Sequence, residues 1–324
     1  MKDAKEYDVI VVGSGGGALL AAVRAHDLGL SVLVIEKSDQ YGGTTATSGG
    51  AIWIPLNGQA PDNFDSAYTY LKAAVGDTTT DVKVRAYLES GAAMVRYVNE
   101  KTSLRYKVSE GYADYYAELP GAVDSGRAME PVPFNGALLG EEFARLRPSH
   151  PGATLMGIAI TIPESNAMAT KAPGWIGIVL KIMARYWFDF PWRFRTRRDR
   201  RLCLGTALIG GLRHSLLKRN IPLWLECPME SLVYEQGRVQ GVVARRKGAA
   251  VTLRARRGVV LAAGGFERNQ AMREQYLPKP TRAEWAATPA GLNTGDTIRA
   301  AAAIGAKLEH MDMSWGVPTV RNPA

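Results

Sequence analysis

Cysteine and histidine are scarce in this chain, whose 324 residues include two cysteines and four histidines. Cys203 and Cys227 fit no metal-binding or redox spacing, which favours a reducing compartment and two small buried thiols. No cluster of His, Cys and carboxylates has the spacing of metal ligands, and no GxSxG motif or Cys/His pair indicates a hydrolase. We therefore expect neither a metal centre nor nucleophilic hydrolysis.

Long apolar runs are also missing. The first apolar stretch, 9–12, is a predicted strand followed by glycines, unlike the basic and apolar regions of a secretory signal. The apolar residues 175–180 are followed by Lys181 and Arg185, so this stretch is too short and too charged to span a bilayer. Apolar residues make up 46% of the chain, which is ample for a packed core. The expectation is a cytoplasmic protein.

Residues 7–55 carry the order strand, glycine turn, helix and second strand. In a dinucleotide-binding turn, Gly13 permits the tight turn, Gly15 lets a pyrophosphate approach the backbone, and Ala18 lets the helix pack closely on the strand. The first helical turn then offers unpaired amide donors and the positive end of its dipole. The predicted phosphate-binding residues are Gly13, Ser14, Gly15, Gly16, Gly17 and Ala18.

The second predicted strand, 31–35, ends in Glu36, which lies 18 residues past Ala18, where a ribose-binding carboxylate is expected. A carboxylate there favours an unphosphorylated ribose, hence FAD or NAD rather than NADP. A second run of small residues follows at once and suits a long cofactor that lies extended across the sheet edge, which favours FAD. The residues of this stretch assigned to the cofactor are Glu36, Lys37, Gly42, Gly43, Thr44, Thr45, Ser48, Gly49 and Gly50.

Three segments together resemble a known family of flavoproteins. EKSDQYGGTTATSGGAIWIP at 36–55, read with AAGGF at 262–266 and NTGD at 293–296, resembles the fumarate reductase and ketosteroid dehydrogenase group of FAD proteins. Within that group, GGTTATSGGAIW and the partial motif MDMSW at 311–315 resemble the 3-ketosteroid dehydrogenases most closely. The resemblance covers most of positions 5–318 and thins between about 130 and 200. It implies an α/β fold, in which a Rossmann-like FAD-binding domain with a small antiparallel β meander precedes a substrate-covering domain.

The resemblance also assigns cofactor contacts late in the chain. In the family, a buried strand returns to the cofactor, which places Ala263 and Gly264 beside it, and main-chain groups near Met229 meet the adenine. Asp296 fits two roles equally, a cofactor contact and the N-terminal cap of a helix that runs through Ala306. The family usually has Gly at the position of Thr297, a departure that bears on the space near the flavin.

A loop predicted at 111–121 holds three tyrosines within five positions. In the ketosteroid dehydrogenases a corresponding Asp-Tyr segment places a tyrosine beside the substrate. By that match Tyr115, directly after Asp114, is the first choice for this role and Tyr116 the second. The alternative is that these tyrosines are half-buried loop anchors with bonded hydroxyls.

The resemblance implies dehydrogenation next to a ketone. A tyrosinate takes a proton from carbon 2 of the steroid A ring while a hydride leaves carbon 1 for flavin nitrogen 5, and hydrogen-bond donors stabilise the developing enolate. In the family, the proton-abstracting tyrosine and the ketone donors lie in regions that this chain does not contain, and Tyr115 matches a supporting tyrosine. We therefore expect a C-terminally truncated protein, weak or inactive alone, with an incomplete flavin site.

The partners implied are an apolar 3-ketosteroid-like substrate and an electron acceptor that the sequence does not identify. Two alternatives remain open. One is a fumarate reductase-like enzyme of small dicarboxylates, against which the aromatic segment at 111–116 argues. The other is a non-catalytic flavin-binding fragment.

The chain is expected to form an FAD-binding domain at 1–275, with an irregular insertion at about 130–202, and the beginning of a substrate-covering domain at 276–324. Residues 181–201 hold eight basic, two acidic and six aromatic side chains. Three interpretations are open: a solvated insertion packed by its aromatics, a segment on anionic lipid, or a nucleic-acid patch. An apolar substrate favours peripheral membrane contact through 175–201 and no nucleic acid.

Periodicity predicts the remaining elements. Apolar spacing indicates helices within 62–102 and at 205–220. Strands are predicted at 222–226 and 258–261, with a small antiparallel meander between them at 231–234, 239–245 and 250–255. Positions 130–170, rich in Pro and Gly, show no clear period and are expected to be irregular.

Overall fold

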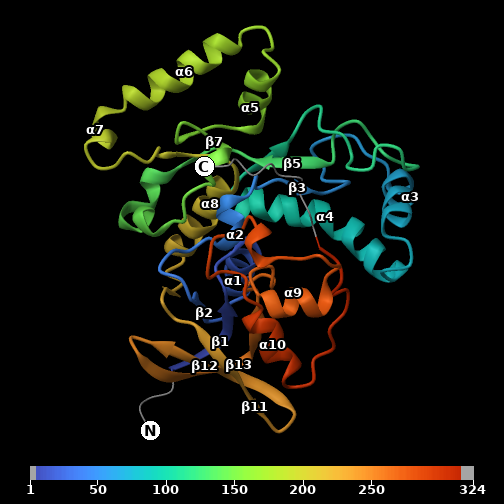
Figure 1. The fold of residues 1–324 in the computed structure, drawn as a ribbon, viewed down its shortest axis with the longest axis vertical. Helices are drawn as coiled ribbons and strands as arrows, with labels where there is room; N and C mark the ends of the chain where they lie inside the picture. The colour runs from blue at the N-terminus through green and yellow to red at the C-terminus, as the bar shows by residue number, and fades with distance from the viewer. Residues whose placement is uncertain (1–4, 315–324) are drawn as a thin grey trace.

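A six-stranded mixed sheet forms the base of the fold (Figure 1) in the computed structural model, which describes residues 5–314. The first four strands of the sheet are parallel, and the last two run antiparallel to their neighbours. This arrangement confirms the predicted α/β class. The strands lie in the order β10 (Leu223–Trp224), β2 (Val32–Ile35), β1 (Lys5–Val12), β13 (Ala249–Leu261), β12 (Arg238–Arg246) and β11 (Met229–Glu235).

Alternate side chains of the central strands enter two separate buried clusters. Val11 and Val34 pack in a cluster with helix residues, whereas Ile10 and Leu33 pack with Val242 and other residues of the meander. Since strands covered on both faces need apolar side chains at successive positions, VIVV and VLVI are recognisable as strands in the sequence.

The meander and the returning strand are one continuous element. The sequence predicts separate strands at 250–255 and 258–261, but β13 runs unbroken through both and pairs in parallel with β1. The turn between β11 and β12 holds Gln236 and Gly237, both at positive φ, as a tight hairpin turn requires. The predicted turn near Gly237 is therefore confirmed.

Helix α1 (Gly16–Asp27) lies against the parallel strands, and α8 (Leu204–Lys218) packs on both α1 and α2 (Gly43–Thr47). α8 is buried along most of its length, and a Cβ at its Gly205 would lie 1.9 Å from the carbonyl oxygen of Thr45 in α2. Glycine therefore sets the distance between α2 and α8. The small residues of α2 lie against the glycine turn, where the Gly16 amide donates to the Thr45 hydroxyl at 3.1 Å.

The predicted helical region 62–102 forms two helices, α3 (Phe64–Val75) and α4 (Asp81–Lys101). α3 ends at Gly76, whose φ of +53° suits glycine. Beside them lies a three-stranded sheet of β3 (Ile52–Trp53), β5 (Ala128–Pro131) and β4 (Tyr106–Val108).

The region 130–170 is more regular than the sequence analysis expects. Thr161 and Glu164 form a reciprocal capping box at the start of α5, a signal visible in the sequence. The irregular interpretation is wrong because this region folds from very short elements that show no extended period. They are β6 (Phe134–Asn135), the 3-10 helices Gly136–Arg145 and Pro151–Ala153, β7 (Thr154–Leu155), β8 (Ile158–Ala159) and α5 (Ile162–Ala169).

The rest of the insertion forms α6 (Trp175–Trp187), α7 (Phe190–Arg193) and β9 (Arg201–Leu202). Helices α5, α6 and α7 project from the molecule at the top of Figure 1, far from the six-stranded sheet. Ile182 of α6 is buried against Ile158 and Ile160. Within residues 5–314, none of the helices combines the length and apolarity needed to cross a membrane.

The C-terminal part contributes α9 (Gln270–Tyr276), a 3-10 helix at Ala283–Trp285 and α10 (Asp296–Ala302). The helix predicted through Ala306 begins as expected but ends four residues earlier. Trp315, the last residue of the MDMSW motif, lies outside the described residues.

We expect Gly205→Ala to lower the free energy of unfolding by about 2 kcal/mol or more, because the new methyl overlaps the Thr45 carbonyl and α8 must shift. The control is Gly177→Ala in α6, where the added Cβ meets no atom within 4 Å and alanine favours a helix interior. Denaturant unfolding of both variants checks the prediction. Equal stability of the two variants would contradict the close contact between α2 and α8.

Candidate cofactor site

A cleft lies where β1, β2 and β13 end, at the carboxyl edge of the parallel strands. Ligands bind at this edge in open α/β sheets. Fifteen of the residues assigned to the cofactor from the sequence line this cleft: Gly13, Ser14, Gly15, Gly16, Gly17, Ala18, Glu36, Lys37, Gly43, Thr44, Thr45, Met229, Ala263, Gly264 and Asp296.

The glycine turn after β1 is held tightly against β13. Gly13 has φ +108°, its amide donates to the Ile35 carbonyl at 2.8 Å, and a Cβ on it would lie 2.4 Å from the Ala262 oxygen. No other residue type fits this conformation and space. Gly15 caps α1 without a side chain, and the Thr45 hydroxyl accepts from the Gly16 amide at 3.1 Å, while Gly15, Gly16 and Gly17 line the cleft.

Glu36 is buried at the end of β2. One carboxylate oxygen accepts from the Ser14 hydroxyl at 2.6 Å and the other from the Ser38 amide at 3.0 Å. The Ser14 oxygen in turn accepts from the Gly42 amide at 3.0 Å. These bonds fix the carboxylate at the edge of the cleft and join the glycine turn to the second run of small residues.

Lys37 links the end of β2 to the start of α10. Its ammonium donates to the Thr294 hydroxyl at 2.7 Å and to the Asp296 carboxylate at 2.8 Å. Burial acts to raise the pKa of Asp296, but the hydrogen bonds from Lys37 and Thr294 outweigh it and lower this pKa below its ordinary value. The carboxylate therefore stays charged and keeps the link closed at neutral pH.

Asp296 does not cap α10. Gly295, at φ +76°, occupies the cap position, and Asp296 is the first residue inside the helix. The cap interpretation is wrong because the glycine before Asp296 takes the left-handed conformation at which the helix begins. The carboxylate still lies near the positive end of the helix dipole.

Asn293 connects the same C-terminal segment to α2. Its amide donates to the Thr44 hydroxyl at 2.9 Å and to the Glu267 carboxylate at 2.6 Å. Asn293 has φ +48°, and a Cβ on Gly264 would lie 2.5 Å from its side-chain oxygen. The segment is thus fixed across the cleft by contacts that only tertiary folding brings together.

Eight further residues, to which the sequence assigns no cofactor contact, also line the cleft. Most adjoin an assigned residue, which is the one signal in the sequence that could have found them. They are Val12, Ile35, Cys227, Pro228, Ala262, Leu292, Asn293 and Thr297.

Gly42, Ser48, Gly49 and Gly50 do not line this cleft. Gly42 caps α2 at φ +115°, and the Ser48 hydroxyl donates to the Thr45 carbonyl at 2.8 Å. A Cβ on Gly50 would lie 2.7 Å from the Gly205 amide. In the structure Gly42, Ser48 and Gly50 shape the contact between α2 and α8, and the predicted cofactor contacts of all four residues remain predictions.

Tyr115 and Tyr116 lie apart from the cleft on the 111–121 loop. Their side chains are 61% and 48% exposed, with the ring centroids 5.4 Å apart. The buried side chain at the base of this loop is Asp114, which accepts from the Trp53 indole at 2.7 Å. The substrate contact of the tyrosines and their alternative role as loop anchors both stay predictions.

Both cysteines are free and buried, as the sequence predicts. Burial raises the pKa of Cys203 to about 12 and also raises the pKa of Cys227. Neither thiol is therefore a thiolate at neutral pH. Among the side chains of the described part of the chain, no group of three or more His, Cys, Asp or Glu could hold a metal ion.

Comparison with known proteins relates this site to flavoproteins. The protein-family model described as "FAD binding domain" matches residues 8–324. A 3-oxosteroid 1-dehydrogenase of Comamonas testosteroni is 43% identical over 304 residues, which are 91% of this chain and 53% of the relative. One from Mycobacterium tuberculosis is 38% identical, with 98% of this chain and 57% of the relative covered.

Comparison with solved structures also relates this chain to flavoproteins. A crystal structure of 3-ketosteroid delta1-dehydrogenase from Sterolibacterium denitrificans in complex with 1,4-androstadiene-3,17-dione is 56% identical, with a TM-score of 0.95. The match covers 99% of this chain and 58% of that one. A flavocytochrome c3 fumarate reductase is 18% identical with a TM-score of 0.60, which shows a shared fold alone.

This chain spans little more than half the length of the curated relatives it matches. The family match nevertheless covers nearly all of it and agrees with the glycine turn, the buried carboxylate of Glu36 and the returning strand. The chain belongs to the FAD binding domain family, whose cofactor is FAD, and within it is similar to the 3-oxosteroid 1-dehydrogenases.

Proposed function

We propose that this chain is the FAD-binding part of an oxidoreductase that dehydrogenates the A ring of 3-ketosteroids between carbon 1 and carbon 2. The observation that carries the proposal is its similarity along 99% of its length to a steroid-bound delta1-dehydrogenase. The fumarate reductase alternative rests on distant likeness alone, with 18% identity. Since the chain covers about half of its curated relatives, the activity is proposed for the longer protein.

The residues of the cleft fit an FAD molecule. A Cβ on Gly43 would lie 3.9 Å from the Gly15 main chain. Side chains on these two glycines would therefore fill the space between the glycine turn after β1 and the small residues at 42–50. Glu36 presents a buried carboxylate that can accept from ribose hydroxyls. The α1 N-terminus supplies the positive end of a dipole for the pyrophosphate.

Bound FAD supplies the acceptor for the hydride removed from the steroid A ring. The chain's own residues bind and orient it: Lys37 and Asp296 close one side of the cleft, while Thr44 and Asn293 close another. Tyr115, with Tyr116 beside it, is proposed to contact the steroid. The proton-abstracting tyrosine is assigned to none of the described residues.

The sequence predicts a domain boundary at residue 275, and we propose that the boundary lies after α10 instead. Asn293 and Asp296 lie beyond residue 275, yet they contact residues of the first 45 positions. This supports a substrate-covering domain that begins only after α10 has completed the cofactor cleft. The insertion at 130–202 remains part of the FAD-binding domain in this division.

A second proposed property is peripheral contact with an anionic membrane through residues 175–201. Large apolar side chains of this segment are exposed, up to 90% for Phe194: Ile176, Leu180, Trp187, Phe188, Phe190 and Phe194. They lie on the projecting helices in a stretch with a net charge of +6. Exposed aromatics interleaved with basic residues are typical of segments in the lipid interface, and a steroid substrate dissolves in lipid.

We expect Glu36→Ala to weaken FAD binding roughly 10–100-fold, the effect of removing charge-assisted hydrogen bonds to the ribose. Asp39→Ala is the control, since Asp39 is an exposed carboxylate three residues away that does not line the cleft. Titration of the flavin-free chain with FAD, followed by flavin fluorescence, measures both affinities. Equal affinity in the two variants would contradict the ribose assignment.

The proposed activity predicts that 4-androstene-3,17-dione bleaches the visible flavin absorption of the longer protein without oxygen, because hydride reduces the flavin. The 324-residue chain alone should bind FAD and bleach weakly. Succinate is the control, since a fumarate reductase-like site would respond to it. A longer protein that is bleached by succinate and not by the steroid would overturn the proposal.

For the membrane contact, we expect the double variant Phe188→Ser with Phe194→Ser to bind vesicles of phosphatidylcholine and phosphatidylglycerol about tenfold more weakly, because both rings leave the lipid interface. Tyr234→Ser, which removes an exposed aromatic of β11, should bind like the unaltered chain. Sedimentation with vesicles measures the binding. Equal sedimentation with phosphatidylcholine alone would show that charge plays no part.

A further inference from the structure

The loop that carries Tyr115 and Tyr116 is closed at its neck by Asp114. The Asp114 amide donates to the Val123 carbonyl at 2.9 Å, and the Val123 amide donates back to the Asp114 carboxylate at 3.0 Å. The loop between them is exposed at its tyrosines, whereas the Asp114 side chain is 1% exposed. Its conformation therefore depends on a buried carboxylate at its base.

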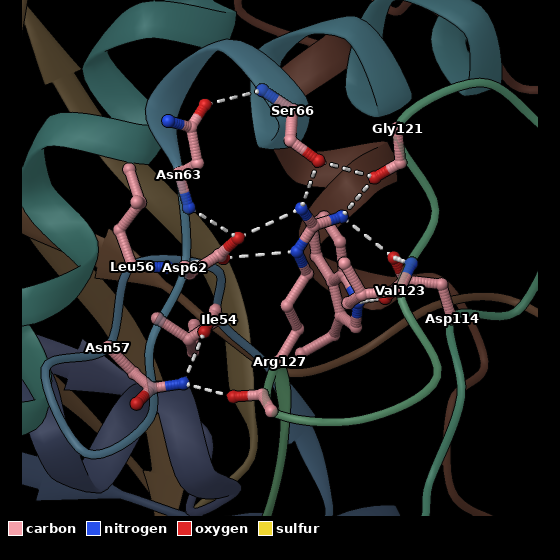
Figure 2. A network of polar contacts seen from close by, with 12 residues as sticks. Ile54, Leu56, Asn57, Asp62, Asn63, Ser66, Asp114, Gly121, Val123 and Arg127 are labelled. Carbon is pink, nitrogen blue, oxygen red and sulfur yellow. Dashed lines mark hydrogen bonds and ion pairs between the residues drawn. The ribbon is translucent and has the colours of Figure 1, made fainter.

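A buried arginine lies beneath this neck (Figure 2). Arg127 donates to Asp114 at 2.7 Å and to the Gly121 carbonyl at 2.9 Å. The other side of its guanidinium donates to both oxygens of Asp62, at 3.0 and 2.9 Å. Arg127 thus lies between two carboxylates, and Asp114 is the one that belongs to the tyrosine loop.

Asp114 also joins the loop to the cofactor half of the molecule. Its second oxygen accepts from the Trp53 indole at 2.7 Å, and Trp53 lies in β3, directly after the run of small residues 42–50. The Trp53 ring is stacked on Tyr87 at 6.3 Å between centroids. The hydrogen bond from Trp53 fixes Asp114 relative to residues 42–50, the segment that packs α2 against α8.

We propose that Asp114 is a positioning residue, which holds the Tyr115 loop at a fixed place relative to the flavin so that its tyrosines meet the steroid. This inference rests on the proposed function. Every side-chain partner of Asp114 is a donor: the Trp53 indole to one oxygen, and Arg127 and the Val123 amide to the other. A carboxylate accepts from all three donors. The side-chain amide of asparagine would instead turn its own N–H group toward the donors on one side.

The network contains its own matched control. Asp62 is also buried, and all of its partners are donors too: Arg127 and the amides of Leu56 and Asn63. Asp62→Asn therefore disturbs the same arginine, at two of its hydrogen bonds rather than one, but it removes no bond at the neck of the tyrosine loop. Burial acts to raise the pKa of Asp62, and the hydrogen bonds from Arg127 lower this pKa overall.

The experiment compares Asp114→Asn with Asp62→Asn in the longer protein, loaded with FAD. Hydrogen exchange of the amides at 112–123 should be about tenfold faster in Asp114→Asn and unchanged in Asp62→Asn, since losing one charge-assisted hydrogen bond has about this effect. The rate of flavin bleaching by 4-androstene-3,17-dione should fall about tenfold in Asp114→Asn alone, with FAD affinity unchanged in both.

Two results would overturn the inference. Equal rates of hydrogen exchange at the amides of 112–123 in the two variants would show that the network stabilises the fold without holding the tyrosine loop in particular. Faster exchange in Asp114→Asn with bleaching as fast as in the unaltered protein would show that the loop is not positioned for the reaction. If the unaltered protein is not bleached at all, the proposed function fails instead, and the exchange comparison still decides whether Asp114 fixes the loop.

Discussion

The parallel pairing of β1 with β13 is the constraint on which the rest of the structure depends. Val12 lies opposite Leu261, almost 250 residues later, and the two strands end side by side at the cleft. Gly13 must then pass within contact distance of Ala262, which leaves no room for a side chain. The glycine turn after β1 therefore has its geometry only when β13 is in place.

Side-chain links between distant segments complete the site. Lys37 and Thr44 reach the C-terminal segment at Asp296 and Asn293, while Ser14 joins the glycine turn to Glu36. Each bond satisfies a polar group that is buried or partly buried at the edge of the cleft, where an unpaired group would cost stability. The same bonds hold the carboxylate and hydroxyl groups in place before any ligand arrives, which reduces the cost of ordering them on binding.

The sequence predicts those parts of the fold and site that depend on contiguous residues. The glycine turn, both central strands and the long helices follow from local pattern. Asn293 was not assigned because its contacts with Thr44 and Glu267 form only after folding. The cap of α10 lies at Gly295 because that residue adopts a left-handed conformation, which composition alone does not distinguish from a cap at Asp296. The strands β6, β7, β8 and β9 of the insertion span two residues each, too short for any period to show.

Two segments of the molecule expose aromatic side chains, the 111–121 loop and residues 175–194. Different contacts hold each segment in place. The tyrosine loop leaves its rings in solvent and is anchored by ionic bonds among Asp114, Arg127 and Asp62, all buried. Residues 175–194 are anchored by apolar contacts of Ile182 and by the ion pairs of Arg185 with Asp199 and Asp189 with Arg200, whose arginines are partly exposed. Buried ion pairs fix direction, since each hydrogen bond has a geometry, whereas apolar contacts and solvent-exposed ion pairs tolerate small shifts. Precise placement is what a steroid beside a flavin requires, and a lipid surface requires only that apolar and basic groups face it.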